Sequence, residues 1–579
     1  MAGQPKPSFY VALGVVIFAL LAFAIYRADI FAPKAPEVQP GGGAGGGAID
    51  PAMLGQTAEA DDASSVTTVS EYKFVPKTTL PEVKGTSAYQ PLKENTVRFA
   101  LNVWAGWGPI ILANDGFKAG KVWKGPGGKD FKVELVLIDD PVAMRNAYAA
   151  GEVHIGWATL DMLPLLLDGL VKAGDSRVMP RIYQQVDWSN GGDGIVARES
   201  IKTVADLRGK KIVMAQNSPS QYFALNMLVA GGVQPSEVDM MYTNTAFEAA
   251  RAFEVQKDIA AAVSWAPDIY NLSEVKGNRM LVTTATANKL IADVWFARAD
   301  FAKDHPEICE GLVRGIFDAM DALKLQENQQ KCAALMGEGY DIPASECLSM
   351  FGDAHSTNWA DNYQFFLNRN NPTNFERVWN QAYYLYKRIG AISADKVPFD
   401  QVMDYSILQK LGEEDKYKQQ TSDYNPVFVP KSVQEIKAES EEILTNTVVI
   451  HFFPNSWDLY KKVSKEIDGK TVEELYDPSV DLVLEEAAQV TEQFGMARVV
   501  IEGHTDASMR GQVPDNLVKQ LSMNRANAVK EGLVAKYKLD PNKFSVVGMG
   551  WDVPADSGDP NNHAKNRRVE IKIYPAESQ

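Results

Sequence analysis

The chain has 579 residues, of which 45% are hydrophobic and 10% aromatic, so it holds enough apolar material for several packed domains. Its 74 acidic side chains outnumber 58 basic ones, which gives a formal net charge of −16. A surface of that charge repels nucleic acid and anionic lipid, which excludes both as partners for the bulk of the chain.

An uncharged apolar run covers residues 9–26, with Lys6 before it and Arg27 after it. About 20 apolar residues rising about 1.5 Å each cross a bilayer, so the run is long enough for a transmembrane helix. A cleavable signal peptide is the alternative, although the small-x-small sequence AFA at residues 22–24 lies inside the run. We expect residues 1–31 to be an uncleaved signal anchor, a single pass through the inner membrane with the bulk of the chain in the periplasm.

Residues 32–94 are polar, contain scattered prolines and include the low-complexity stretch GGGAGGGA at residues 41–48. Glycine-rich sequence is flexible, and a coil of this length spans on the order of 45 Å. We expect this segment to be a linker that clears the membrane surface without fixing the orientation of the downstream domains.

Residues 95–410 alternate short apolar strands, such as TVRFALNVW, KVELVLID and KKIVMA, with helical stretches. This alternation predicts an α/β domain with sheets wrapped by helices. The last part of the domain, residues 301–410, is mostly helical in pattern. The polar, proline-containing residues 411–432 are expected to be a second linker.

Ligands of such sheets bind beyond the carboxyl ends of the strands, so residues that come after each predicted strand are candidate contacts. Indole rings suit an apolar, planar or cationic part of a ligand. The helix that begins in QNSPSQ offers backbone N–H groups to an anion, and Asp187 or Asp268 suits an amine. The candidate solute-binding residues are Trp104, Trp107, Thr159, Asp187, Ser218, Ser220, Gln221, Trp265, Asp268 and Trp295.

No catalytic arrangement accompanies these loops in the sequence. There is no GxSxG motif and no Cys–His pair, and KGPGGKD at residues 124–130 lacks the spacing of a phosphate-binding loop. The six histidines include no pair at metal-ligand spacing. We therefore expect a binding protein rather than an enzyme, with no metal and no cofactor.

Three cysteines, Cys309, Cys332 and Cys347, are too few for a fold that depends on a disulfide framework. Two alternatives stay open from the sequence. One pair is bridged in an oxidising compartment, or all three are buried thiols.

Four segments of the middle domain succeed one another in a recognisable order: NVWAGWGP, AAGEVHIGWATLDMLP, VADLRGKKIVMAQNSPSQYFALNML and AAVSWAPD. Together they resemble periplasmic solute-binding proteins of the nitrate/sulfonate/taurine type. The resemblance implies two lobes, with hinges near residues 190 and 290, that close on a small solute such as an oxyanion or a sulfonate. It also implies delivery of the solute to an ATP-driven permease.

Residues 433–579 predict a second, smaller α/β unit with the order β-α-β-α-β-β. Asp506 comes after the predicted strand ARVVIEGH, and Arg525 lies on the next helix. A carboxylate binds an ammonium group and a guanidinium binds a carboxylate, so the two side chains together suit a zwitterion. The plain alternative is a surface salt bridge worth about 0–1 kcal/mol.

The sequences GHTD, LSMNRANAV, GMGWDVPA and NHAKNRRVEIKI extend this pattern. They resemble the OmpA-like peptidoglycan-binding domain. The resemblance implies that Asp506 binds the free amine of the diaminopimelate in the stem peptide and that Arg525 binds its carboxylate. It also implies that Thr505 shapes the loop and that Asn566 and Arg568 brace the site or contact the ligand.

Two features depart from the pattern of that family. The loop between Asp506 and Leu521 is a few residues longer than usual, and Val518 stands where an asparagine is common, with Asn516 out of register. These departures put the backbone donors of the loop in question and point to a reduced affinity.

The expected fold is therefore α/β: a two-lobed periplasmic-binding-protein fold plus a small α/β OmpA-like domain, after one N-terminal transmembrane helix. The expected function is an inner-membrane-anchored periplasmic protein that binds a small solute and attaches non-covalently to peptidoglycan. Its expected partner is an ABC permease or another inner-membrane protein.

Two alternatives remain. A stator-like or structural subunit of an envelope complex would carry an acidic residue in its membrane span, and residues 9–26 hold none. An enzyme on a binding-protein scaffold, as in pyrimidine-precursor synthesis, would need a reactive histidine or cysteine in the pocket loops.

Overall fold

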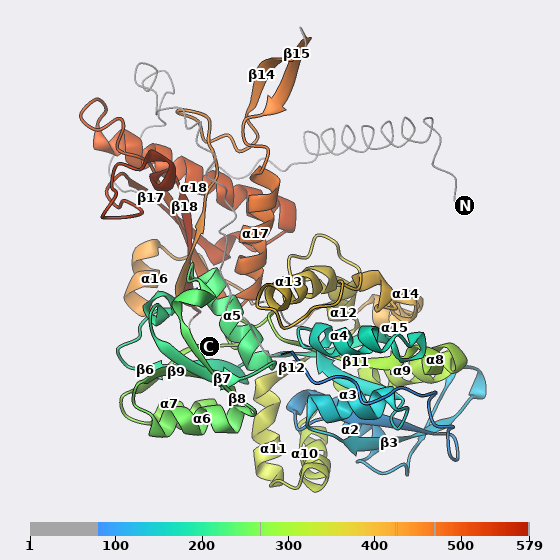
Figure 1. Ribbon diagram of the computed structural model, residues 1–579. Coiled ribbons are helices and arrows are strands. Elements are labelled where there is room, and N and C mark those ends of the chain that lie inside the picture. The colour runs from blue at the N-terminus through green and yellow to red at the C-terminus, as the bar shows by residue number, and fades with distance from the viewer. Residues whose placement is uncertain (1–78, 267, 423, 425, 468–469, 577–579) are drawn as a thin grey trace. The chain divides into compact units, whose positions relative to one another are not determined.

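The computed structural model describes residues 79–576, apart from residues 267, 423, 425, 468 and 469 (Figure 1). The predicted signal anchor and the glycine-rich part of the first linker lie outside the described residues. None of the helices in the described part has both the length and the apolar character needed to span a membrane.

A seven-stranded mixed sheet forms the first lobe of the middle domain. Its strands are β1 (Thr96–Leu101), β2 (Val122–Trp123), β3 (Phe131–Leu137), β4 (Ile155–Thr159), β5 (Pro180–Ser189), β11 (Ala292–Arg298) and β12 (Ala354–Ser356). They lie in the order β12-β5-β11-β4-β1-β3-β2. β1 runs parallel to β3 and β4, whereas β11 runs antiparallel to β4 and β5.

The helices of the first lobe begin and end at ordinary sequence signals. Asp140 accepts a hydrogen bond from the backbone N–H of Ala143, which caps α3. Gly174, with a φ of 71°, ends α4 in the left-handed conformation that glycine tolerates. The helices are α2 (Gly108–Asn114), α3 (Pro141–Ala149), α4 (Leu163–Ala173), α8 (Ala299–Asp304), α9 (Pro306–Ala322), α10 (Gln326–Tyr340) and α11 (Ala344–Met350), with short 3₁₀ turns η2 (Ala105–Trp107), η3 (Pro126–Gly128) and η4 (Ser176–Val178).

A five-stranded sheet forms the second lobe. Its strands are β6 (Asp193–Arg198), β7 (Lys211–Ala215), β8 (Asp239–Thr243), β9 (Ile259–Trp265) and β10 (Asn278–Thr283). They lie in the order β10-β6-β9-β7-β8, with β7 parallel to both neighbours. Its helical elements are α5 (Pro219–Ala230), α6 (Ala246–Val255) and α7 (Asp268–Glu274), with the turns η5 (Val204–Leu207) and η6 (Pro235–Glu237).

The chain passes between the two sheets at two places, both near the positions predicted for hinges. It leaves the first sheet at the end of β5 and enters β6, and it returns between β10 and β11. The Thr284 hydroxyl joins the two crossings, because it accepts hydrogen bonds from the backbone N–H groups of Gly191 (2.9 Å) and Asp193 (3.1 Å). That these crossings act as hinges remains a prediction.

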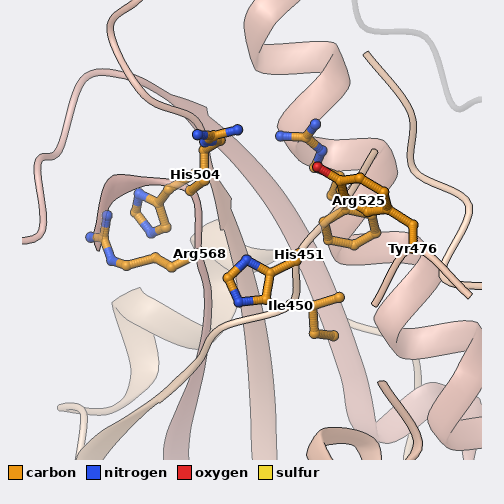
Figure 2. Close-up of a pocket in the computed structure, with 8 residues that line it drawn as sticks. Ile450, His451, Tyr476, His504, Arg525 and Arg568 are labelled. Atoms are coloured by element: carbon orange, nitrogen blue, oxygen red, sulfur yellow. The ribbon is translucent and has the colours of Figure 1, made fainter. Parts of the chain in front are cut away.

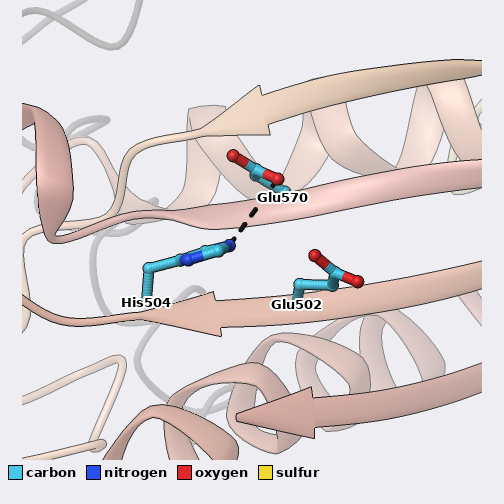
Figure 3. Close-up of side chains that lie close together, drawn as sticks. All are labelled: Glu502, His504 and Glu570. Atoms are coloured by element: carbon cyan, nitrogen blue, oxygen red, sulfur yellow. Dashed lines mark ion pairs between the residues drawn. The ribbon is translucent and has the colours of Figure 1, made fainter. Parts of the chain in front are cut away.

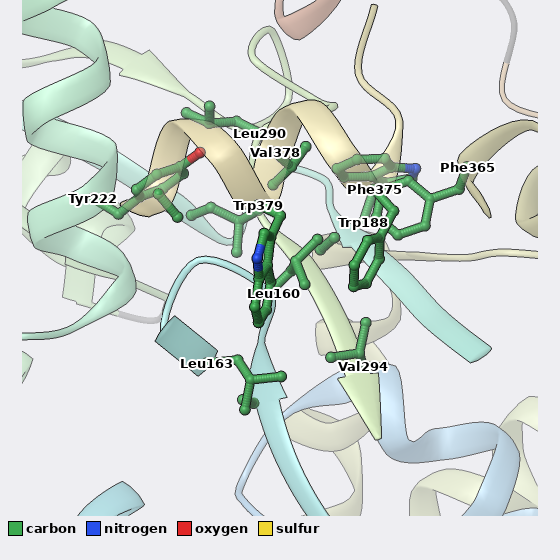
Figure 4. Packing of buried hydrophobic residues seen from close by; sticks show 14 of the residues in the cluster. Leu160, Leu163, Trp188, Tyr222, Leu290, Val294, Phe365, Phe375, Val378 and Trp379 are labelled. Carbon is green, nitrogen blue, oxygen red and sulfur yellow. The ribbon is translucent and has the colours of Figure 1, made fainter. Parts of the chain in front are cut away.

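Helices complete the middle domain, as the sequence pattern predicts for residues 301–410. They are α12 (Trp359–Phe366), α13 (Phe375–Arg388), α14 (Ser406–Leu411) and α15 (Asp415–Lys418), with the turns η7 (Phe351–Asp353) and η8 (Phe399–Gln401). Aromatic rings fill the space beneath α13 (Figure 4). Trp188, at the end of β5, packs edge-on against Phe365 with ring centroids 5.3 Å apart, and Phe375 stacks on Trp379. This packing fixes the strand end that carries Asp187.

Both predicted linkers contain segments that pack on the middle domain. Within residues 79–94, the Ser87 carbonyl accepts a hydrogen bond of 2.6 Å from the buried guanidinium of Arg298. In the second linker, Tyr424 is buried and stacks on His355 with ring centroids 3.8 Å apart. These stretches are therefore held in place, because they satisfy buried polar and aromatic groups of the lobe.

A four-stranded sheet forms the C-terminal domain. Its strands are β13 (Leu444–Val448), β16 (Ala497–His504), β17 (Phe544–Gly550) and β18 (Val569–Pro575), in the order β13-β18-β16-β17. The helical elements are α16 (Val433–Glu439), α17 (Val480–Gln493), α18 (Asp515–Tyr537) and α19 (His563–Asn566), with the turn η9 (Pro541–Lys543). One face of α18 is apolar and packs into the core, since Ala526, Val529 and Leu533 are fully buried.

The start of this domain differs from the expected order. The apolar run VVIHFF begins at Val448, but β13 ends at that residue and is formed by the residues before it. An unexpected hairpin of β14 (Lys462–Ile467) and β15 (Lys470–Leu475) comes next (Figure 1). The dipeptide Asp468-Gly469 between the two strands is a hairpin signal that the sequence contained.

Two glycines let α18 approach the sheet closely enough to bring Arg525 beside the end of β16. A Cβ atom on Gly503 would lie 1.9 Å from the Ser522 carbonyl oxygen, and one on Gly548 would lie 2.0 Å from that of Lys519. Both positions therefore require glycine.

Candidate functional sites

Two carboxylates face each other across neighbouring strands of the first lobe. In the antiparallel register, Asp293 of β11 lies opposite Asp187 of β5 on one side and Thr159 of β4 on the other. Asp187 is completely buried and Asp293 is 4% exposed. Directly opposed residues on such strands have Cβ atoms about 4.5–5.5 Å apart, so the two carboxylates share one small volume.

Asp161 and Asp193 complete a group of four that we call the aspartate cluster (Asp161, Asp187, Asp193 and Asp293). Asp161 lies just after β4 and is completely buried, and neither of its carboxylate oxygens has a hydrogen-bond partner. Asp193, at the start of β6, accepts a hydrogen bond of 2.7 Å from the Ser189 hydroxyl. The four belong to three strands and one loop, and they meet where the chain crosses between the sheets.

The electrostatics of the aspartate cluster favour the neutral acids. Burial raises the pKa of Asp161, Asp187 and Asp193 each to about 7. Burial, together with the charge of Asp187, raises the pKa of Asp293 well above its ordinary value. None of the four forms an ion pair with a lysine or arginine in the described part of the chain. Ionising any of the four acids therefore places a negative charge that no lysine or arginine of the described structure neutralises.

Trp104 covers the cluster from the loop after β1. Its indole N–H donates a hydrogen bond of 2.9 Å to Asp187 Oδ2. The loop can approach so closely because residue 106 is glycine: a Cβ atom there would lie 1.4 Å from Asp187 Oδ2. A Cβ atom on Gly192 would lie 2.5 Å from the Trp104 ring, so the indole also lies against the crossing between the lobes.

The other candidate indoles divide into two groups. Trp107 and Trp295 are buried in the core, where their N–H groups donate to Asn102 (2.7 Å) and Gln184 (3.1 Å) and their rings pack on Phe99. Trp265, by contrast, is half-buried at the end of β9, opposite Asp193 in the register. We therefore leave Trp107 and Trp295 out of the proposed site.

The start of α5 carries the three polar candidates of the second lobe. The Ser218 oxygen caps the helix by accepting from the Gln221 N–H, and its hydroxyl donates to the Ala215 carbonyl. Ser220 Oγ and Gln221 Nε2 are buried without hydrogen-bond partners. Asp268, the first residue of α7, has its pKa raised by burial. A role of these residues in binding remains a prediction.

The C-terminal domain contains a small pocket lined by Arg525 and Arg567, and Asp506 contacts Arg567. Asp506 is completely buried, and its carboxylate lies 3.0 Å from Arg567 Nε and 3.3 Å from His563 Nδ1. Arg525, on α18, donates a hydrogen bond of 3.0 Å from Nε to the Ser456 carbonyl oxygen. The sequence analysis missed Arg567, which lies between the two residues chosen from the Asn-Arg-Arg motif.

Cationic side chains dominate the lining of this pocket, which we call the arginine pocket (Figure 2). Arg525 and Tyr476 lie on one side of it, and His504 and Arg568 lie on the other. Three guanidinium groups around one small volume favour a ligand with carboxylates. The lining residues are Ile450, His451, Phe452, Tyr476, His504, Arg525, Arg567 and Arg568.

The remaining predicted residues of this domain shape the walls of the site. Thr505 is buried, and its backbone N–H donates to the Gly550 carbonyl. The Asn566 side chain accepts from the Ala555 N–H and donates to the Pro560 carbonyl, both at 2.8 Å. Asn566 thus braces the loop before β18, which is one of the two roles that the resemblance implied.

Glu502, His504 and Glu570 bring three possible metal-ligand atoms within 4.8 Å of one another on neighbouring strands (Figure 3). Cations of the protein already neutralise these carboxylates, since Lys572 lies 3.6 Å from Glu502 and 3.4 Å from Glu570. Burial alone would raise the pKa of Glu570, but His504, Arg568 and Lys572 lower it to about 2. The group is therefore an ion network of the sheet, and it fits a metal ion poorly.

Comparison with known proteins finds family matches for two separate segments of the chain. The NMT1/THI5-like family matches residues 129–328, and the OmpA family matches residues 471–568. The chain is 29% identical over 224 residues to the taurine-binding periplasmic protein of Escherichia coli K12, an alignment that covers 36% of this chain and 66% of that protein. It is 34% identical over 109 residues to outer membrane protein Omp38 of Acinetobacter baumannii, covering 19% of this chain and 28% of that protein.

Among solved structures, the periplasmic aliphatic sulphonate binding protein SsuA from Escherichia coli is 20% identical, with a TM-score of 0.41, and covers 53% of this chain and 97% of that one. The chain spans less than two thirds of the length of either relative, the taurine-binding protein or Omp38. The sheets and helices of the chain define the α/β class. The chain thus joins a segment that matches the NMT1/THI5-like family to a C-terminal segment that matches the OmpA family, which confirms both resemblances.

Proposed function

We propose that the protein is a receptor of the bacterial envelope that captures a small solute in its two-lobed domain and attaches non-covalently to peptidoglycan through its OmpA domain. The arginine pocket beside the buried Asp506 carries this proposal. A peptidoglycan stem peptide that ends in diaminopimelate offers carboxylates for the guanidinium groups and an amine for the aspartate. In this picture residues 9–26 anchor the chain in the inner membrane, and an inner-membrane permease receives the solute.

The pocket residues have different roles because they come from different elements of the domain. Arg525 comes from α18, whereas Arg567 and Arg568 come from the segment before β18, so a carboxylate between them contacts both walls. Asp506 is buried and lies 3.0 Å from Arg567 Nε. A ligand amine therefore competes with Arg567 and His563 for the aspartate, which adds a cost to binding and agrees with the reduced affinity expected from the longer loop.

Sedimentation with purified peptidoglycan sacculi tests the wall-binding role. The full-length protein is expected to pellet with sacculi, and Arg525→Ala is expected to leave it in the supernatant. Lys536→Ala is the matched control, because Lys536 is on the same helix and loses one positive charge, yet it pairs with Asp481 and does not line the pocket. Equal pelleting of wild type and Arg525→Ala would remove the arginine pocket from peptidoglycan binding.

The solute role depends on the two lobes closing around the crossings between β5 and β6 and between β10 and β11. Ligands of doubly wound sheets bind at such strand ends, where loops from several strands converge. Here Trp104, Trp265 and the aspartate cluster converge at these crossings. The domain is therefore a receptor with its recognition groups at the junction of the lobes.

A further inference from the structure

The fold around the aspartate cluster leaves several of its carboxylate oxygens without a hydrogen-bond partner. A buried carboxylate is normally paired with a cation or saturated with hydrogen-bond donors, because desolvation otherwise disfavours its charge. Both oxygens of Asp161 and the Oδ1 atom of Asp187 are buried without a hydrogen-bond partner. Two such acids at one junction lower stability, so a ligand is the natural source of the missing partner.

The open hydrogen-bonding positions at the cluster are acceptors. Trp104 supplies one donor to Asp187, which is also hydrogen-bonded to Asp293, and Ser189 supplies one donor to Asp193. The nearest neighbours add more acidity: Asp353, which accepts a hydrogen bond of 2.6 Å from the Tyr270 hydroxyl, raises the pKa of Asp193 further. A ligand that fits must bring donors and positive charge, which is the chemistry of a protonated amine.

The surrounding rings suit the same ligand. The Trp104 indole touches Asp187 and the crossing at Gly192, and Trp265 lies opposite Asp193 in the sheet register. Indole faces attract ammonium groups through the ring quadrupole, and the attraction grows when the cation is desolvated. An aromatic ring beside paired carboxylates is a combination that binds amines.

Other ligand classes fit less well. Within the described residues, only Glu502, His504 and Glu570 bring three metal-ligand atoms within 4.8 Å, so the aspartates are spread too widely for a bare metal ion. A sulfonate or another oxyanion would meet four carboxylates, none of which has a lysine or arginine as its ion-pair partner in the described structure. At the start of α5, where an oxyanion would bind, the Ser218 hydroxyl already donates its hydrogen bond to the Ala215 carbonyl.

We propose that the solute is an organic cation, a small molecule of net positive charge with at least one protonated amine, and that Asp187 and Asp293 hold one amine between them. Asp161 and Asp193 hold a second amine or the far end of the same cation, and Trp104 covers it. The inference rests on the proposed function of this domain as a solute receptor, and it names the chemical class of the solute.

Isothermal titration calorimetry on the full-length protein tests the proposal with four probes: 1,3-diaminopropane, 1,4-diaminobutane, taurine and ethanesulfonate. At least one diamine is expected to bind, and ethanesulfonate is expected to give no binding. Asp187→Asn and Asp293→Asn should each weaken diamine binding about tenfold or more, because each removes one charge from the shared volume. Asp258→Asn, an exposed aspartate that pairs with Lys211, is the matched control and should change nothing.

Thermal melting separates loss of binding from loss of the fold. Asparagine is nearly the same size as aspartate and carries no charge, so both cluster variants should melt at or above the wild-type temperature without ligand. Tighter binding of taurine or ethanesulfonate than of either diamine overturns the proposal of a cationic solute but not the receptor function. Diamine binding that neither asparagine variant weakens has the same meaning. Failure of all four probes to bind overturns both.

Discussion

Replacing Asp161 with asparagine should stabilise the protein at neutral and alkaline pH. Burial raises the pKa of Asp161 from 3.8 to about 7. That shift is roughly three units at about 1.4 kcal/mol each, so folding with the charged residue costs about 4 kcal/mol once the pH exceeds both values. Asparagine cannot ionise, so the variant folds without the free-energy cost of a buried charge.

The difference in stability between Asp161→Asn and the wild type depends on pH. Below about pH 4 the acid is protonated in both the folded and unfolded states, so Asp161 carries no penalty and the variant gains little. As the pH rises from about 4 to 7, the unfolded state loses its proton first, and the wild type loses stability relative to Asp161→Asn. Above about pH 7 the difference reaches its full size of about 4 kcal/mol.

Urea unfolding monitored by tryptophan fluorescence measures the difference at about pH 4.5 and pH 8. The signal reports the solute-binding domain, because nine of the 11 tryptophans lie between residues 104 and 379. Asp258→Asn is a control of opposite sign, since its pairing with Lys211 lowers the pKa of Asp258 and the variant should lose stability as the pH rises. An Asp161→Asn variant that is no more stable than wild type at pH 8, or equally stabilised at both pH values, would refute the reasoning.

Three further substitutions test separate parts of the structure. Trp104→Phe removes the indole N–H that donates to Asp187, so calorimetry should show weaker diamine binding, about threefold to tenfold, at an unchanged melting temperature. Gly503→Ala places a methyl group 1.9 Å from the Ser522 carbonyl oxygen, so scanning calorimetry should show loss of the C-terminal melting transition. Lys543→Met leaves three carbonyl oxygens near the end of α17 without their buried donor, and urea unfolding should show a loss of about 2–4 kcal/mol in that domain. Unchanged values for any of the three would contradict the contact concerned.

The parts of the site that the sequence predicted are those encoded by short, contiguous motifs. Asp506 and Arg525 lie in two such motifs, and the glycines around them allow the helix to approach the sheet. The crossings near residues 190 and 290 also result from local alternation of strands and helices. In each case neighbouring residues determine the local structure, so one sequence is sufficient.

The aspartate cluster could not be predicted from local pattern. Asp187 was a candidate, but its partner Asp293 lies more than 100 residues away, and only the antiparallel register of β5 with β11 brings the two together. Asp161 and Asp193 join them through the loop after β4 and the crossing into β6. Conversely, the indoles of Trp107 and Trp295 turn into the core, and the direction of a side chain depends on the twist and pairing of strands that the sequence does not specify.

The central claim is that one chain holds the cell wall and a cationic solute at the same time. Sacculi incubated with the full-length protein and radiolabelled 1,4-diaminobutane, then pelleted and counted, test it directly. Label is expected to pellet in proportion to bound protein. Arg525→Ala should remove both protein and label from the pellet, and Asp293→Asn should remove the label alone. Protein that pellets without label, or label that pellets equally with Asp293→Asn, would contradict it.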